Sequence, residues 1–184
     1  MVGFYFGPNN FIDVQYSLLS DSSKKTPTLE AGISFLLPSN LTEFRWIGDG
    51  PYAGYPGKSA LNEFGFYHLN SNDLYFSGNR QNVDCAVFSD AKGNGFALIA
   101  KRGNIAVERT DKGLLVSHNA LVSGRFNKGN LPEELKTFDS NNSFGGGFTI
   151  VPLSYPWPPI LEKLFGPAQQ LAIPYKPFYN SYDQ

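Results

Sequence analysis

Between residues 83 and 118, short apolar runs alternate with clusters of glycine and asparagine. The apolar runs are Val83–Phe88, Phe96–Ala100, Ile105–Val107 and Leu114–Val116. The clusters between them are Lys92-Gly93-Asn94-Gly95, Arg102-Gly103-Asn104 and Asp111-Lys112-Gly113. Glycine and asparagine tolerate the positive φ angles that tight hairpin turns require. The pattern therefore predicts four consecutive antiparallel strands, which need further sheet structure to bury their apolar faces.

The rest of the chain continues the strand pattern. Residues 12–18, 33–37 and 43–46 alternate apolar and polar side chains, a period of two that places apolar groups on one face of a strand. Only Pro158–Phe165 has apolar residues at helical spacing. Roughly ten short strands without a helical layer have to bury their faces sheet on sheet. We therefore expect residues 1–184 to form a single all-β domain, an antiparallel sandwich with one short helix near the C-terminus.

Composition argues against several partners. The chain has 15 Lys and Arg residues against 16 Asp and Glu residues, a formal charge of −1, which offers no attraction for nucleic acid or an anionic membrane. No stretch approaches the roughly 20 apolar residues that span a bilayer, and Met1–Tyr5 lacks the features of a signal peptide. Cys85 is the only cysteine, so we expect neither an internal disulfide nor a zinc site built on several thiolates. We expect no metal and no cofactor, and the sequence leaves the cellular compartment open.

Two sequence blocks resemble a known family. Trp46–Pro56 reads WIGDGPYAGYP and resembles the Trp-Tyr-Gly-x-Gly-Pro-x-Glu-Asn-Tyr signature near the start of the C-terminal domain of family 2 β-galactosidases. Gly78–Asp84 resembles the Gly-Asn-Arg-x-Asp-Val-Arg stretch of the same domain. The order and the spacing of the two blocks match those of the family. The similarity covers Thr28 to about Gly147, and more faintly Ala172–Tyr179.

The resemblance implies a β-supersandwich of the galactose-mutarotase type that packs against a catalytic barrel. In such enzymes both catalytic glutamates are carried on the barrel, and this chain contains no barrel. The resemblance thus implies a non-catalytic C-terminal fragment of a larger hydrolase, whose partners are the remaining domains of that parent and a galactoside or other glycan. Ala53 and Gly54 replace the Glu and Asn of the family signature. Gly145–Thr149 replaces a loop that carries a tryptophan towards the sugar, which argues against a sugar-facing role for this segment.

We expect none of the carboxylates to be catalytic. Retaining glycoside hydrolysis needs two carboxyl groups about 5 Å apart across the scissile bond. Glu133 and Glu134 are neighbours in a polar stretch and would point apart if extended, whereas Glu63 and Glu108 belong to different predicted strands. The sequence therefore places no suitable pair, and solvated surface is the favoured interpretation of all these residues.

Histidines are considered because the related mutarotases use a histidine and a carboxylate as general base and acid. His68 shares a strand face with Phe64 and Phe66, and His118 is expected at a rim where a strand ends. A structural role is favoured for both. Cys85 alternates with apolar neighbours and is expected to be a buried small hydrophobe rather than a nucleophile.

Sugar recognition needs aromatic rings against the apolar face of a pyranose and a few fixed hydrogen-bonding groups. The candidates are Tyr52 and Tyr55 in the Gly-Pro loop, Asn79 and Arg80 in the second block, and Trp157 in the segment YPWPP. The prolines around Trp157 stiffen its backbone, so its ring would lose little entropy on stacking against a sugar. The alternative for Trp157 is an apolar plug beneath the short helix, and the alternative for Tyr52 and Tyr55 is a place in the core.

The preferred functional hypothesis is an accessory domain of a β-galactosidase-like hydrolase that packs on the catalytic barrel and shapes the rim of the sugar pocket. An autonomous carbohydrate-binding module is the first alternative. The second alternative, a mutarotase-like epimerase, requires a histidine and a carboxylate that face each other in a cleft.

Overall fold

The computed structural model describes residues 1–20, 23–57, 59–124, 135–141 and 143–165, and it confirms an antiparallel all-β fold with one short helix. The elements are β1 (Val2–Phe6), the short 3-10 helix η1 (Pro8–Asn10), β2 (Ile12–Leu18), β3 (Thr26–Pro27), β4 (Glu30–Leu37), β5 (Glu43–Gly50), β6 (Glu63–Asn70), β7 (Gly78–Ser89), β8 (Gly95–Thr110), β9 (Gly113–Val122), β10 (Thr137–Phe138), β11 (Phe144–Leu153) and α1 (Pro159–Phe165).

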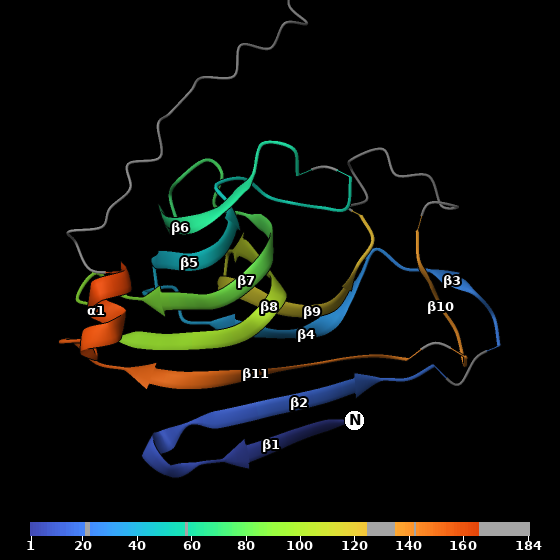
Figure 1. The fold of residues 1–184 in the computed structure, drawn as a ribbon, viewed down its shortest axis with the longest axis horizontal. Helices are drawn as coiled ribbons and strands as arrows, with labels where there is room; N and C mark the ends of the chain where they lie inside the picture. Colours follow the sequence, from blue (N-terminus) through green and yellow to red (C-terminus); the bar gives the residue numbers. More distant parts are fainter. Residues whose placement is uncertain (21–22, 58, 125–134, 142, 166–184) are drawn as a thin grey trace, which may run out of the picture.

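The strands form two layers that share β7 and β8. The main sheet has nine strands, and its longest path runs β1-β2-β11-β8-β7-β5-β6, as Figure 1 shows from one edge to the other. The second half of β8 pairs with β9, which in turn pairs with β4, so these strands form the second layer. β3 and β10 make a separate two-stranded sheet at one end of the molecule.

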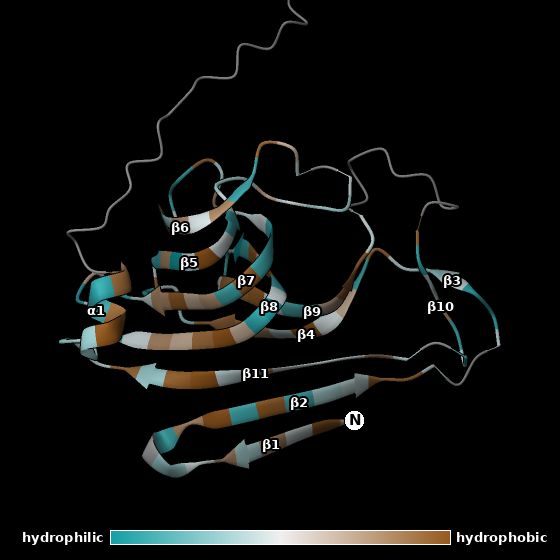
Figure 2. Ribbon diagram, viewed as in Figure 1, coloured by the Kyte–Doolittle hydropathy of each residue, from teal (hydrophilic) through white to brown (hydrophobic). Residues whose placement is uncertain are grey.

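Alternation along β2 explains which face of the main sheet is buried. Val14 and Tyr16 are buried, whereas Asp13 and Gln15 between them are exposed. Figure 2 shows the same alternation as brown and teal bands along β2. The strand expected at residues 12–18 is therefore confirmed with its predicted orientation.

The prediction of a turn at residues 102–104 is wrong, because β8 passes through this segment without reversing. The predicted four-strand meander consequently has three strands, β7, β8 and β9. Lys101 and Arg102 have φ angles of 50° and 65°, and the pairing of β7 with β8 shifts register between Arg80 and Cys85. These irregularities are bulges that bend both strands from one layer into the other. The Gly103-Asn104 signal thus lies next to a bend rather than a turn, and the positive φ angles fall on the two residues before it.

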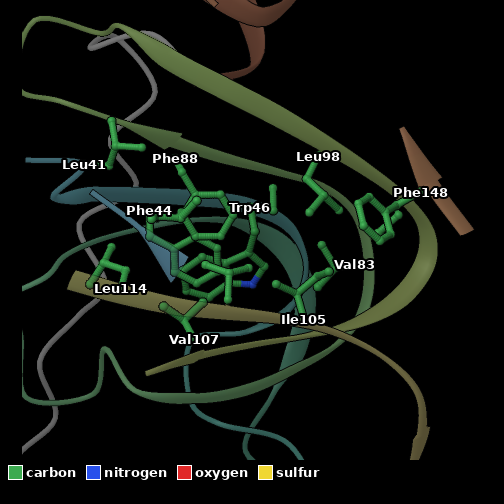
Figure 3. Packing of buried hydrophobic residues seen from close by; sticks show 14 of the residues in the cluster. Leu41, Phe44, Trp46, Val83, Phe88, Leu98, Ile105, Val107, Leu114 and Phe148 are labelled. Carbon is green, nitrogen blue, oxygen red and sulfur yellow. The ribbon is translucent and has the colours of Figure 1, made fainter. Parts of the chain in front are cut away.

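The core between the layers is mainly aromatic at its centre. The ring centroids of Phe44 and Trp46 in β5 lie 4.7 Å apart, and Phe44 also stacks on Phe88 of β7 at 5.0 Å. Leu98 and Ile105, both from β8, point into the same cluster in Figure 3. Full burial of side chains of this size contributes about 1.5–3 kcal/mol each. Phe44 and Trp46 are both fully buried, as the alternation of residues 43–46 predicts for the apolar face of this strand.

A second apolar cluster lies on the opposite face of the main sheet, beneath α1. Its buried members are Cys85, Val87, Ala97, Leu153, Trp157 and Phe165. Cys85 is 8% exposed, so its predicted burial is confirmed, and this burial raises the pKa of the thiol to about 12. Among the helices of the described residues, none has the length and apolar character to span a membrane.

His118 does not lie at a rim as expected. β9 continues beyond it to Val122, and the His118 side chain is buried between the layers. The Tyr16 hydroxyl lies 2.8 Å from both the Nδ1 atom and the carbonyl oxygen of His118. The hydroxyl donates to the carbonyl, which leaves its oxygen to accept from Nδ1–H. His118 therefore ties the two layers together.

Candidate functional site

A pocket of about 300 Å³ lies where β5, the hairpin between β7 and β8, and the segment 155–165 meet. Arg45 enters from β5, on the sheet face opposite the core-facing Phe44 and Trp46. The hairpin contributes residues 89–93, and α1 contributes Glu162 and Phe165. The pocket therefore combines residues that are far apart in the sequence.

Trp157 forms one wall of this pocket and is largely enclosed. Only 7% of its surface is exposed, and its indole N–H donates to the carbonyl oxygen of Gly93 at 2.5 Å. The guanidinium carbon of Arg45 lies over the ring, 5.5 Å from its centroid. Arg45 and the apolar cluster beneath α1 thus cover much of the ring that the sequence hypothesis assigned to sugar stacking.

Gly93 allows the aromatic segment to approach the hairpin closely. Its φ angle is 85°, a value that favours glycine. A Cβ atom at this position would meet the Tyr155 side chain at 3.2 Å and the Trp157 Nε1 atom at 3.4 Å. Tyr155 rests here and keeps 59% of its surface exposed. The absence of a side chain at Gly93 therefore lets Tyr155 and Trp157 pack against the turn and line the pocket.

Polar and charged neighbours hold the Arg45 side chain in place. Its NH1 group donates to the Ser89 hydroxyl at 3.3 Å, and its NH2 group lies 3.7 Å from the Glu43 carboxylate. Burial lowers the pKa of Arg45, and attraction to Glu43 and Glu162 opposes that effect. The Oε2 atom of Glu162 is buried and has no hydrogen-bond partner within the described part of the chain. The pocket thus holds a fixed cation beside a carboxylate oxygen that lacks a donor.

The other predicted sugar-contact residues gather at the opposite end of β7. Asn79 and Arg80 begin this strand and have 0% of their surface exposed, whereas Ser89 of the pocket ends it. The Asn79 amide donates to the Gly54 carbonyl oxygen at 2.9 Å, and the Asn79 backbone N–H donates to the Tyr55 hydroxyl at 3.2 Å. These bonds attach the Gly-Pro loop to β7.

Arg80 and Tyr52 complete this loop anchor. Arg80 donates to the carbonyl oxygen of Tyr75 at 2.7 Å, and its guanidinium carbon lies 5.0 Å from the Trp46 ring centroid. Burial lowers the pKa of Arg80 to about 10. Tyr52 is half-buried and meets Tyr75 edge-on, with centroids 5.2 Å apart. Asn79, Arg80 and Tyr55 position the loop, and none of them lines this pocket or the other described one.

Neither histidine lines this pocket or the second described one, which lies between β1, β2, β8 and β11. His68 contacts the Glu43 carboxylate, with 2.5 Å between its Nε2 atom and Glu43 Oε2, and Asn70 donates to the other carboxylate oxygen at 2.6 Å. A histidine and a carboxylate therefore meet on the sheet surface, but outside either pocket. Glu133 and Glu134 lie outside the described residues. Across those residues, no cluster of His, Cys, Asp and Glu side chains is suited to a metal ion.

Sequence reasoning did not select Arg45, Tyr155 or Glu162 for this site. Arg45 had a detectable signal, since a charged residue alternates there with two core aromatics. Tyr155 adjoins the proline segment that drew attention to Trp157. Glu162 had no detectable signal in the sequence, because a single carboxylate on a short helix is common on protein surfaces.

Fold and pocket together define an antiparallel β-sandwich domain with a small pocket at one end that charged and aromatic side chains line. Residues 2–137 match the family model described as the beta galactosidase small chain. The chain therefore belongs to the beta galactosidase small chain family. No curated protein sequence matches it.

The chain is also similar to several solved structures. A putative aldose 1-epimerase from Escherichia coli K12 is 10% identical, with a TM-score of 0.44 over 82% of this chain and 58% of its own. A galactose mutarotase related enzyme from Lactobacillus acidophilus is 13% identical, with a TM-score of 0.42 over 83% of this chain and 60% of its own. The chain spans less than two thirds of either structure.

Proposed function

We propose that this chain is the non-catalytic C-terminal domain of a β-galactosidase-like enzyme of glycoside hydrolase family 2, and that it packs on the catalytic barrel of its parent. The observation that carries the proposal is the match of residues 2–137 to the beta galactosidase small chain family. A small chain of this kind requires a second component that supplies the two carboxylates of glycoside hydrolysis.

The first hairpin is the proposed packing surface. β1 occupies an edge of the main sheet and pairs only with β2 within the described residues. Its side chains Phe4, Tyr5 and Phe6 are exposed, Phe6 to 80%, and the strand carries no charge. Uncharged, apolar edge strands are uncommon on free surfaces because they pair readily with other chains. The proposed occupant is an apolar surface of the catalytic component.

A role at the rim of the sugar site is the finer part of the proposal. Among the residues selected from the sequence, Trp157 is the one that lines the pocket beneath α1. An autonomous carbohydrate-binding module is the second candidate, favoured by the same pocket. The mutarotase-like alternative has less support, since the pair of His68 and Glu43 lies outside both described pockets.

Co-expression tests the packing proposal. The chain should co-purify with the remaining polypeptide of its parent hydrolase, and the complex should hydrolyse a nitrophenyl β-galactoside while the chain alone does not. Phe6→Lys should release the chain from the complex, because it buries a charge in an apolar interface. The control Glu108→Lys adds positive charge on β8, away from the hairpin, and should leave the complex intact. Turnover by the purified chain alone, lost on mutating one of its carboxylates, would refute the proposal.

A further inference from the structure

We propose that the pocket between β5, the β7–β8 hairpin and α1 binds one neutral monosaccharide through Glu162, Arg45 and Tyr155, with Trp157 as the support for Arg45. Only the choice of a galactoside as the ligand rests on the proposed function. The site itself rests on the geometry of the pocket.

Glu162 provides the strongest indication of a ligand. Its Oε2 atom is buried and lacks a hydrogen-bond partner among the described residues. The Glu162 side chain also lines a pocket of about 300 Å³. Buried carboxylate oxygens are costly without a donor, and nearly all buried polar atoms in folded proteins have one. A sugar hydroxyl supplies such a donor once the Glu162 side chain turns this oxygen towards the pocket. Arg45 lies close enough to interact electrostatically with Glu162, so the carboxylate needs a neutral donor rather than a second cation.

Arg45 is the complementary donor, and its position is fixed before any ligand arrives. Its guanidinium carbon lies over the Trp157 ring at 5.5 Å, and NH1 donates to Ser89. Glu43 holds the NH2 side at 3.7 Å, and the Glu43 carboxylate is itself held by His68. A guanidinium has five N–H donors in a rigid fork, so these contacts leave donors for a hydroxyl or ring oxygen.

Charge balance selects a neutral ligand over an anion. The lining contains two cations, Arg45 and Lys92, and two carboxylates, Asp90 and Glu162. Asp90 is occupied within its own turn, where it accepts from the backbone N–H groups of Lys92 and Asn94 at 2.8 Å. Glu162 therefore remains as the available acceptor. A site with balanced charge and paired donors and acceptors suits a polyhydroxyl compound.

Tyr155 offers the aromatic face that Trp157 does not. Its ring is 59% exposed and rests against Gly93, whereas Trp157 is enclosed by Arg45 and the apolar cluster. Aromatic rings pack against the apolar face of a pyranose. The volume lies at the small end of ligand pockets, which fits a single sugar ring rather than an oligosaccharide.

Nitrogen-15 NMR titration of the chain with methyl β-galactoside tests the proposal at the level of single residues. The Trp157 indole N–H signal borders the pocket and should move on titration. The Trp46 indole N–H, which donates to the Asp49 carbonyl oxygen within the core, should stay in place and serves as the internal control. Galacturonate, an anionic sugar of similar shape, should bind more weakly than the neutral galactoside.

Matched variants identify the contacts. Glu162→Gln and Tyr155→Ser should each raise the dissociation constant about tenfold, since each removes one ligand interaction of ordinary strength. Glu108→Gln and Phe64→Ser alter an exposed carboxylate and an exposed aromatic residue that line neither described pocket, and should leave the dissociation constant unchanged. Melting temperatures of all variants verify that they fold, and Tyr155→Ser tests the site at an exposed position.

Some outcomes overturn the proposal. It fails if the Trp157 signal does not move at the highest soluble concentration of methyl β-galactoside, if galacturonate binds more tightly, or if the pocket variants bind as well as the controls. All these measurements use the chain alone, so they are independent of co-purification with the parent hydrolase. Failure of packing with intact sugar binding would refute only the proposed function, and the reverse result would refute only this site.

Discussion

His118 connects the two layers through Tyr16, and its burial between them makes stability depend on pH. Burial lowers the pKa of His118 to about 4, from an ordinary value of 6.5. Between these pH values the unfolded chain binds a proton that the folded chain does not, so folding stability falls as pH drops. We expect His118 to account for a loss of about 3 kcal/mol from pH 7 to pH 4.

Denaturant unfolding at several pH values measures this contribution. The difference in free energy of unfolding between the native chain and His118→Gln should shrink by that amount as the pH falls from 7 to 4. The control His68→Gln alters a partly exposed histidine on the sheet surface. A difference for His118→Gln that stays constant with pH would contradict the buried neutral state.

Trp157 illustrates a residue whose type suggests binding and whose surroundings favour structure. Trp157→Ala should lower the free energy of unfolding by about 3–5 kcal/mol, because it leaves a large cavity in the cluster beneath α1. Trp157→Phe keeps most of the ring and loses the hydrogen bond to Gly93, so it should cost about 1–3 kcal/mol. A melting temperature nearly unchanged in Trp157→Ala would contradict the structural role and favour a direct sugar contact.

At the scale of elements, the bend in β8 carries backbone strain. Lys101 has a φ angle of 50°, in the left-handed region that costs side chains with a Cβ about 1–2 kcal/mol. Lys101→Gly should therefore raise the free energy of unfolding by about 0.5–1 kcal/mol, as glycine removes that strain at some cost in chain entropy. Glu108→Gly, in a regular part of the same strand, should lower it by a similar amount. Thermal unfolding of both variants provides the test, and destabilisation by Lys101→Gly would contradict the strain.

The whole molecule should unfold as one unit. β7 and β8 run through both layers, so neither layer can lose its strands without disrupting the other. The calorimetric enthalpy of unfolding should then equal the van't Hoff enthalpy, the signature of a two-state transition. Two resolved transitions, one of them restricted to α1 and its apolar cluster, would show that the chain contains separately folding parts.

Much of the architecture could be predicted because it follows from the alternation of apolar and polar residues along short segments. The period of two in residues 12–18 and 43–46 predicted both the strands and their buried faces. The alternation with apolar neighbours predicted the burial of Cys85. A proline followed by apolar residues at helical spacing predicted α1 to within one residue of its observed start. Each of these features depends on residues adjacent in the chain, so the sequence by itself determined them.

Tertiary structure decided what long-range packing controls. Positive φ near Gly103 suits a turn and a bulge equally, and only the pairing of β8 with both β7 and β11 selected the bend. The sequence pattern placed His118 at a strand end, whereas β9 continues past it to Val122 because β4 pairs with β9 along this length. The pocket unites Arg45, Ser89 and Glu162, which no local pattern connects, because their proximity arises from the stacking of α1 on the sheet. Local periodicity thus determined the strands and their faces, whereas the meeting of distant side chains depended on how those faces packed.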